Sequence, residues 1–242
     1  MKNIFLCLSL LALKLTTAHA AAVQKLQVYY GPSLFKYNLS SEQFSAEQPI
    51  ASGQAYQINY SRQNYDSTAE HRFSLLNSSH NITAPSSLSP SAIKTSQTKL
   101  NYKFILSTEN YNVGGGYSFY KVKADDTTPN ILLSNSESHA LDLFIERSVW
   151  HKSDFSVHLF ADLELPFIRK ELGTNTGFNQ TSYNIHLGYQ AKYLLNDVWS
   201  IVQQSEYAVD STSYDGQGNR GTLNAKEKYE RFQFLLGAGY DF

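Results

Sequence analysis

Hydrophobic and polar residues alternate along most of this chain, so that every second side chain is apolar. The clearest case is residues 228–242, where one face carries an apolar row: Phe232, Phe234, Leu236, Ala238, Tyr240 and Phe242. Segments 99–106, 139–150, 154–165 and 182–193 repeat the alternation. A period of two is typical of β-strands with one apolar face. The sequence therefore predicts an all-β fold.

Weaker alternation predicts further strands over 25–38, 53–63, 70–78, 111–122 and 198–210. Together the segments make about ten strands, and eight or twelve would follow if a weak segment is split or merged. An even number of antiparallel strands can close into a barrel whose two chain ends lie on the same side. We therefore expect a closed antiparallel transmembrane β-barrel, with a soluble periplasmic sandwich or lipocalin-like barrel as the alternative.

The predicted connections alternate between short and long. The short ones are 64–69, 107–110, 151–153 and 195–197. The long ones are rich in Ser, Thr, Asn, Asp, Gly and Pro, as loops are, and cover 40–52, 79–95, 123–136, 167–179 and 211–225. Outer-membrane barrels have short periplasmic turns and long extracellular loops. The connections thus favour a membrane barrel over a soluble sheet.

The N-terminal segment has the pattern of an export signal. Lys2 precedes a short apolar run from Ile4 to Leu13, and Ala18-His19-Ala20 is a small-x-small cleavage site. We expect residues 1–20 to be a cleaved signal peptide and residues 21–242 to form one barrel domain. The removed segment holds two lysines and no acid, so the formal net charge falls from −1 to −3.

Composition narrows the possible functions. The chain holds 21 acidic and 20 basic residues, which argues against a general nucleic-acid binder. Its one cysteine, Cys7, lies in the expected signal peptide, so the mature chain has no thiol chemistry and no disulfide framework. The mean hydropathy of −0.36 suits a membrane barrel, because only alternate residues need be apolar.

With its export signal, its alternating strands and its terminal Tyr240-Asp241-Phe242, the chain resembles the small outer-membrane β-barrel proteins of Gram-negative bacteria. The resemblance implies a place in the outer membrane, among its lipids and lipopolysaccharide. It also implies that the barrel assembly machinery reads Tyr240 and Phe242. The class includes pores, enzymes, adhesins and structural anchors, so the resemblance specifies the compartment rather than the activity.

The polar face of the predicted strands is charged in the second half of the chain. We expect these side chains to line the barrel interior: Asp142, Glu146, His158, Asp162, Glu164, His186, Lys192, Glu206 and Arg231, with Asp241 on the same face. The turn at 151–153 predicts Glu146 opposite His158 and Asp142 near Asp162, with His186 one register step from Asp162. Buried charges need partners, so the first hypothesis is a non-enzymatic porin-like or structural barrel with a charged, mostly filled lumen.

Two other functions remain open. A His/carboxylate pair can transfer protons in a hydrolase, and some outer-membrane barrels are proteases or lipid hydrolases, but no Gly-x-Ser-x-Gly motif occurs here. A surface-loop adhesin is the third hypothesis, with the Ser/Pro-rich residues 83–98 as a candidate contact loop. No cofactor or metal is expected, small solutes are possible ligands, and the oligomeric state is open.

Aromatic residues near the predicted strand ends suggest belts at the two membrane interfaces. The candidates are Tyr183, Tyr193, Trp199, Tyr207 and Tyr229. Trp150 falls on the polar side of its strand and is not assigned to a belt.

Overall fold

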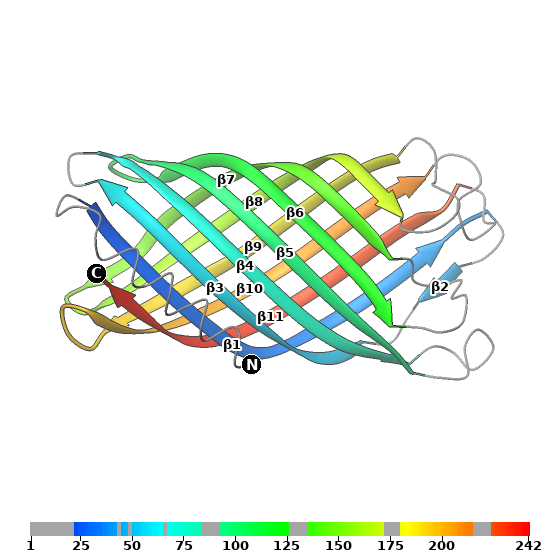
Figure 1. Cartoon of the computed structure of the whole chain (residues 1–242), viewed down its shortest axis with the longest axis horizontal. Coiled ribbons are helices and arrows are strands. Elements are labelled where there is room, and N and C mark those ends of the chain that lie inside the picture. Colours follow the sequence, from blue (N-terminus) through cyan, green and yellow to red (C-terminus); the bar gives the residue numbers. More distant parts are fainter. Residues whose placement is uncertain are drawn as a thin grey trace.

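The protein is a closed barrel of ten long antiparallel strands (Figure 1). The computed structural model describes residues 22–42, 45–47, 50–64, 67–83, 92–125, 135–171, 180–214 and 224–242. The barrel strands are β1 (Ala22–Ser40), β3 (Ala51–Asn64), β4 (Ala69–Thr83), β5 (Ala92–Ser107), β6 (Asn112–Asp125), β7 (Ser136–Lys152), β8 (Phe155–Glu171), β9 (Gln180–Leu194), β10 (Trp199–Tyr214) and β11 (Lys226–Asp241). The expected signal peptide lies outside the described residues.

The barrel closes because its first and last strands pair. Each strand is antiparallel to its neighbour in the chain, and β1 pairs with β11 from Lys25↔Asp241 to Ser40↔Lys226. The amide of Phe242 also donates to the carbonyl of Gln24 over 2.8 Å. No described helix is long and apolar enough to cross a membrane. The prediction of a closed antiparallel barrel of about ten strands is confirmed.

The strands are longer than the alternation alone predicted. The sequence predicts a loop over 79–95, but β4 and β5 continue to pair through His80↔Thr95 and as far as Thr83↔Ala92. Polar residues can occupy these strand ends because paired backbone groups, not apolar side chains, hold them in the sheet. A short strand, β2 (Ser45–Glu47), pairs with the end of β1 inside the predicted loop 40–52.

The outer face of the barrel is apolar and the inner face is polar. Large hydrophobic side chains are exposed on the outside of the strands, among them Leu34, Phe73, Leu141, Leu187 and Leu236. Polar and charged side chains are buried between the walls, among them Gln57, Asn101, Asp142, Glu164 and Gln233. This is the reverse of a soluble barrel, and it is what a barrel in lipid requires.

Four of the predicted belt residues lie on the outer face, and one does not. Tyr183, Tyr193, Trp199 and Tyr207 are all exposed there. Tyr229 is buried inside the barrel, because it shares its inward parity with the buried Arg231 two residues later.

Trp150 also lies on the opposite face of its strand from the one that its place in the alternation predicts. A register shift between Ser148 and Trp150 in the β7–β8 pair adds one residue to β7. A bulge of this kind reverses the alternation that follows it. Trp150 is consequently 58% exposed, as a belt residue would be.

Gly188 leaves room for a large side chain from a neighbouring strand. A Cβ atom on Gly188 of β9 would lie 2.5 Å from Cζ of Phe160 on β8 and would also meet the carbonyl oxygen of Ser205 on β10. The Phe160 ring therefore occupies the space that a side chain at position 188 would need.

We expect the Gly188→Ala substitution to destabilise the folded barrel by about 1–3 kcal/mol, because the ring and the backbone must move to admit the methyl group. The matched control is Gly115→Ala on β6, where the nearest atom, the carbonyl oxygen of Asp142, would lie 3.3 Å from the new Cβ. The control should stay within about 1 kcal/mol of the wild type. Urea unfolding in detergent micelles measures both, and equal losses would contradict the packing argument.

Candidate functional site

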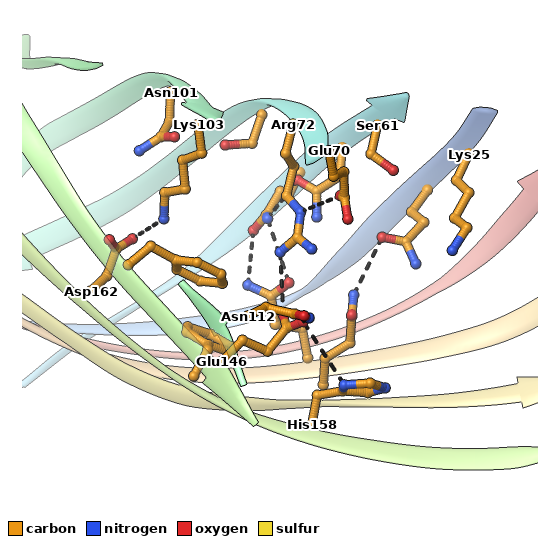
Figure 2. A pocket seen from close by; sticks show the side chains of 18 of the residues that line it. Lys25, Ser61, Glu70, Arg72, Asn101, Lys103, Asn112, Glu146, His158 and Asp162 are labelled. Carbon is orange, nitrogen blue, oxygen red and sulfur yellow. Dashed lines mark hydrogen bonds and ion pairs between the residues drawn. The ribbon is translucent and has the colours of Figure 1, made fainter. Parts of the chain in front are cut away.

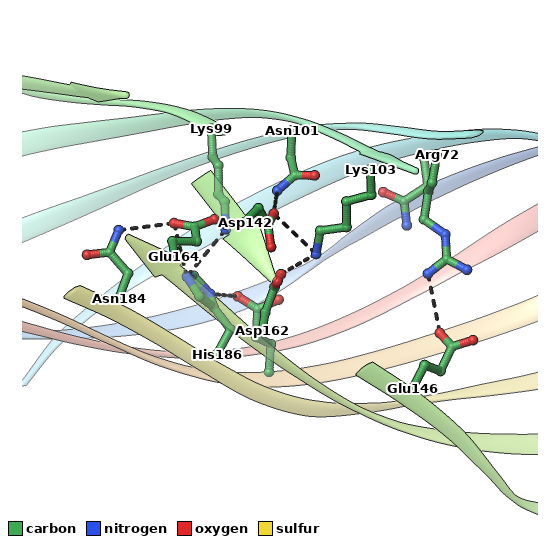
Figure 3. Close-up of polar contacts among 12 residues, drawn as sticks. Arg72, Lys99, Asn101, Lys103, Asp142, Glu146, Asp162, Glu164, Asn184 and His186 are labelled. Carbon is green, nitrogen blue, oxygen red and sulfur yellow. Dashed lines mark hydrogen bonds and ion pairs between the residues drawn. The ribbon is translucent and has the colours of Figure 1, made fainter. Parts of the chain in front are cut away.

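The charged residues of the barrel interior form a connected cluster at mid-height. Lys103 of β5 forms ion pairs with Asp142 of β7, at 3.5 Å, and with Asp162 of β8. The side-chain amide of Asn101 donates to Asp142. Figure 3 shows the Lys103 amine between the two carboxylates. One ammonium group thus offsets two acidic side chains that would otherwise repel each other.

A second group of ion pairs lies beside the first. The Lys99 amine is 2.5 Å from Oε1 of Glu164 and 3.3 Å from Nε2 of His186. The other ring nitrogen of His186 is 3.0 Å from Oε1 of Glu206, which also lies 3.2 Å from Nη2 of Arg231. All these groups are buried or nearly so. The chain of contacts runs from β5 across the lumen to β11.

The carboxylates of Asp142, Asp162 and Glu164 converge to within 4.8 Å, close enough to hold a metal ion. Lys99 and Lys103 already place ammonium groups against these carboxylates. The positive charge that the acids require is supplied by lysines, so the geometry does not favour a metal here.

A polar cavity of about 290 Å³ occupies the turn-side half of the barrel (Figure 2). Arg72 of β4 reaches into it, with Nε 2.9 Å from Glu70 and Nη1 3.3 Å from Glu146. Asn112 donates to Glu146 over 2.8 Å, and Nδ1 of His158 lies 3.8 Å from the same carboxylate. The remaining lining is mostly carboxamide and hydroxyl side chains, such as those of Gln57, Asn59, Ser61, Gln63, Gln190 and Gln204.

The loop-side half of the interior is filled by aromatic and aliphatic side chains. Phe35 stacks on His80 at 5.1 Å between ring centroids, and Tyr37 lies 5.0 Å from Tyr229. Tyr120 belongs to the same buried cluster. The interior therefore has three levels: an aromatic layer near the loops that also encloses the buried Arg169–Glu227 ion pair, an ion-paired layer in the middle and a polar cavity near the turns.

The structure places the residues expected to line the lumen as follows. Asp142, Glu146, Asp162, Glu164, His186, Glu206 and Arg231 lie in the two mid-height groups or beside the cavity. His186 faces Asp162 directly in the β8–β9 register instead of one step away.

Two predicted residues lie nearer the turn end. Lys192 pairs with Asp241 at 2.9 Å, and His158 lines the cavity with its side chain 29% exposed. Glu146 is not directly opposite His158, because the register pairs His158 with Ser148. The two side chains nevertheless meet along the diagonal.

The cations that neutralise these acids are not among the residues expected to line the lumen. Arg72 comes from β4, where the alternation is weak, and Lys99 and Lys103 come from β5, where the alternation is clear. Their place in the alternation identifies them as inward-facing, since all three lie on the same face as polar neighbours such as Ser74 and Asn101. Only barrel closure shows which of the later acids they reach.

The C-terminal aromatic residues lie on the outside of the barrel. Tyr240 is in edge contact with Trp199 of β10, at 4.8 Å between centroids, and with Phe242, at 4.7 Å. Phe242 is 43% exposed. Their recognition by the assembly machinery stays a prediction.

We expect Lys103→Met to destabilise the barrel by about 3–5 kcal/mol, because it leaves two close carboxylates without their shared cation. Adding Asp142→Asn and Asp162→Asn should recover much of the loss. The control is Lys192→Met at the more exposed pair with Asp241, for which we expect about 1 kcal/mol or less. Urea titration followed by the fluorescence of Trp150 and Trp199 measures these changes, and equal effects of the two lysine variants would contradict the prediction.

No family model and no curated protein sequence matches this chain. Among solved structures it is similar to the outer-membrane protease OmpT of Escherichia coli (11% identity, 94% of this chain and 100% of that one, TM-score 0.44). It is also similar to the translocator domain of the autotransporter NalP of Neisseria meningitidis (10%, 100% and 95%, 0.42) and to an outer-membrane channel of Pseudomonas putida F1 (10%, 93% and 97%, 0.43).

Three features of the barrel identify its fold class. Its edge strands pair with each other and close the sheet, its outer face is apolar, and its charged side chains are buried inside. Only a barrel that spans a membrane combines these features. The chain folds as a transmembrane β-barrel of the outer-membrane type.

Proposed function

We propose that this protein is a non-enzymatic outer-membrane barrel with a closed interior, a structural barrel rather than an open porin. The observation that carries the proposal is that side chains from opposite walls meet across the lumen. Arg231 of β11 donates to Gln97 of β5 over 3.2 Å. Gln204 of β10 donates to Gln57 of β3 over 3.3 Å.

These contacts oppose the passage of hydrated ions. An ion crossing the middle layer would have to separate buried pairs such as Lys99–Glu164, and each separated charge would lose its compensating partner. The aromatic layer at Phe35, Tyr37 and Tyr229 is a second barrier, because it is packed with buried rings and holds the Arg169–Glu227 ion pair, which a passing ion would also have to separate. Barrels of this size are commonly filled by their own side chains.

The environment of the two candidate histidines supports a non-enzymatic role. His186 is 2% exposed and enclosed by Lys99, Glu164 and Glu206, so a substrate has no access to it. His158 faces the cavity beside Glu146, but among the described residues no serine or threonine hydroxyl is hydrogen-bonded to its ring. A hydrolase of the Ser–His type needs such a hydroxyl.

We expect the folded protein to show no discrete conductance in a planar bilayer, while a heat-dependent gel shift demonstrates that the same sample is folded. Discrete conductance steps would overturn the closed barrel and favour a narrow channel. In that case the interior acids should favour cations, and the double substitution Glu146→Gln/Asp162→Asn should lower the cation preference relative to the wild type.

The enzymatic alternative has its own test. The rates of peptide and lipid hydrolysis in the presence of the folded protein should equal the rates in a sample without the protein. A hydrolytic activity that disappears in His158→Ala or His186→Ala, but persists in a control variant of the outward-facing His71, would refute the non-enzymatic proposal. The adhesin hypothesis depends on loop residues, most of which lie outside the described part of the chain.

A further inference from the structure

The outer face of β10 carries two polar side chains in the middle of an apolar row. Gln203 and Ser205 point outward, since they share their face of the strand with Ile201 and Tyr207, which are 49% and 42% exposed. Gln203 is half-buried, and its side-chain amide donates to Oγ of Ser205 over 2.8 Å. An amide group therefore lies on the surface that lipid covers.

Gln203 lies near the middle of the apolar belt. The exposed aromatic residues Trp199, at the turn end of β10, and Tyr207, towards the loops, are each four residues from it. Four residues of a strand span about 13 Å, which is about 10 Å along the membrane normal at a tilt of about 40°. Because the apolar band of such a barrel is about 25 Å tall, Gln203 is far from both head-group layers.

The side-chain amide of Gln203 has hydrogen-bonding capacity that its described neighbours do not use. The register places Ala191 of β9 and Leu236 of β11 beside it, and neither side chain can form a hydrogen bond. Among the described residues, Ser205 is its one hydrogen-bonding partner, which leaves one N–H and the oxygen Oε1. Lipid chains supply no partner for these groups, and a polar group without a partner in hydrocarbon costs free energy.

We propose that Gln203 lies in an interface between two copies of this barrel within the membrane. Two copies inserted in the same direction are related by a twofold axis along the membrane normal, so that a residue at the axis meets its own counterpart at the same height. A carboxamide is complementary to itself, because its N–H can donate to Oε1 of the other copy while its own Oε1 accepts in return. A second copy thus supplies the missing partner at the required depth.

The surface around Gln203 allows a close approach. Ala191 lies directly beside Gln203, and Ala238 of β11 lies beside Ile201 on the same outer face. Small side chains let membrane-spanning segments come close together, and hydrogen bonds between polar side chains then hold them, since lipid offers no competing partner. Such an interface does not depend on whether the lumen conducts.

The first test measures self-association of the folded mature chain by sedimentation equilibrium in density-matched detergent micelles. We expect the wild type to dimerise and Gln203→Leu to weaken the dimer about tenfold, because two reciprocal hydrogen bonds are lost. The control is Leu100→Ala on β5, which lies on the opposite wall of the barrel and presents Leu100 to lipid with 47% exposure. It should change the association less than twofold. A heat-dependent gel shift shows that each variant is folded.

Disulfide cross-linking in lipid vesicles locates the interface. The chain's one cysteine, Cys7, lies in the expected signal peptide, so a cysteine introduced into the mature chain is its sole thiol. Ile201→Cys, which keeps Gln203, should cross-link to its counterpart on oxidation, whereas Leu100→Cys should not.

Three results would overturn the proposal. The first is a wild type that stays monomeric at every ratio of protein to detergent. The second is a Gln203→Leu variant that associates as tightly as the wild type. The third is a Leu100→Cys variant that cross-links as readily as Ile201→Cys.

Discussion

The pairing of β1 with β11 is the constraint on which the rest of this structure depends. Lipid offers no hydrogen bonds to the backbone, so a spanning sheet must leave no free edge. The pairing extends from Lys25↔Asp241 to Ser40↔Lys226 and satisfies the backbone hydrogen-bonding groups of the two edge strands. Once the sheet is closed, alternation along each strand sorts the side chains, so that apolar residues contact lipid and polar residues are enclosed.

Enclosing polar residues creates the second requirement, which is charge compensation. Acidic side chains on β7 and β8, such as Asp142, Asp162 and Glu164, are buried inside the barrel. Lysines on β5 supply the compensating charge across the lumen. The same side chains that stabilise the barrel thus fill it, which explains why a chain of this composition can be a membrane protein without being an open pore.

The two faces of the barrel also differ along its axis. The strands have 14–19 residues, and about 9–11 residues suffice to cross the membrane. The additional length at the loop end carries exposed lysines on the outside and an aromatic layer on the inside, whereas the turn end surrounds a polar cavity. The two ends of the barrel therefore enclose different interiors, aromatic side chains at the loop end and a polar cavity at the turn end.

The sequence by itself determined the fold class, because a period of two over ten segments fixes strands, and turn lengths fix their order. It also determined which way most side chains face, including those of Asp142, His186 and Arg231. The tertiary structure decided what the alternation of inward and outward side chains cannot predict. The bulge after Ser148 turned Trp150 outward, and closure brought Lys99 and Lys103 to acids many residues away, since partners across a lumen depend on strand register and shear rather than on spacing along the chain.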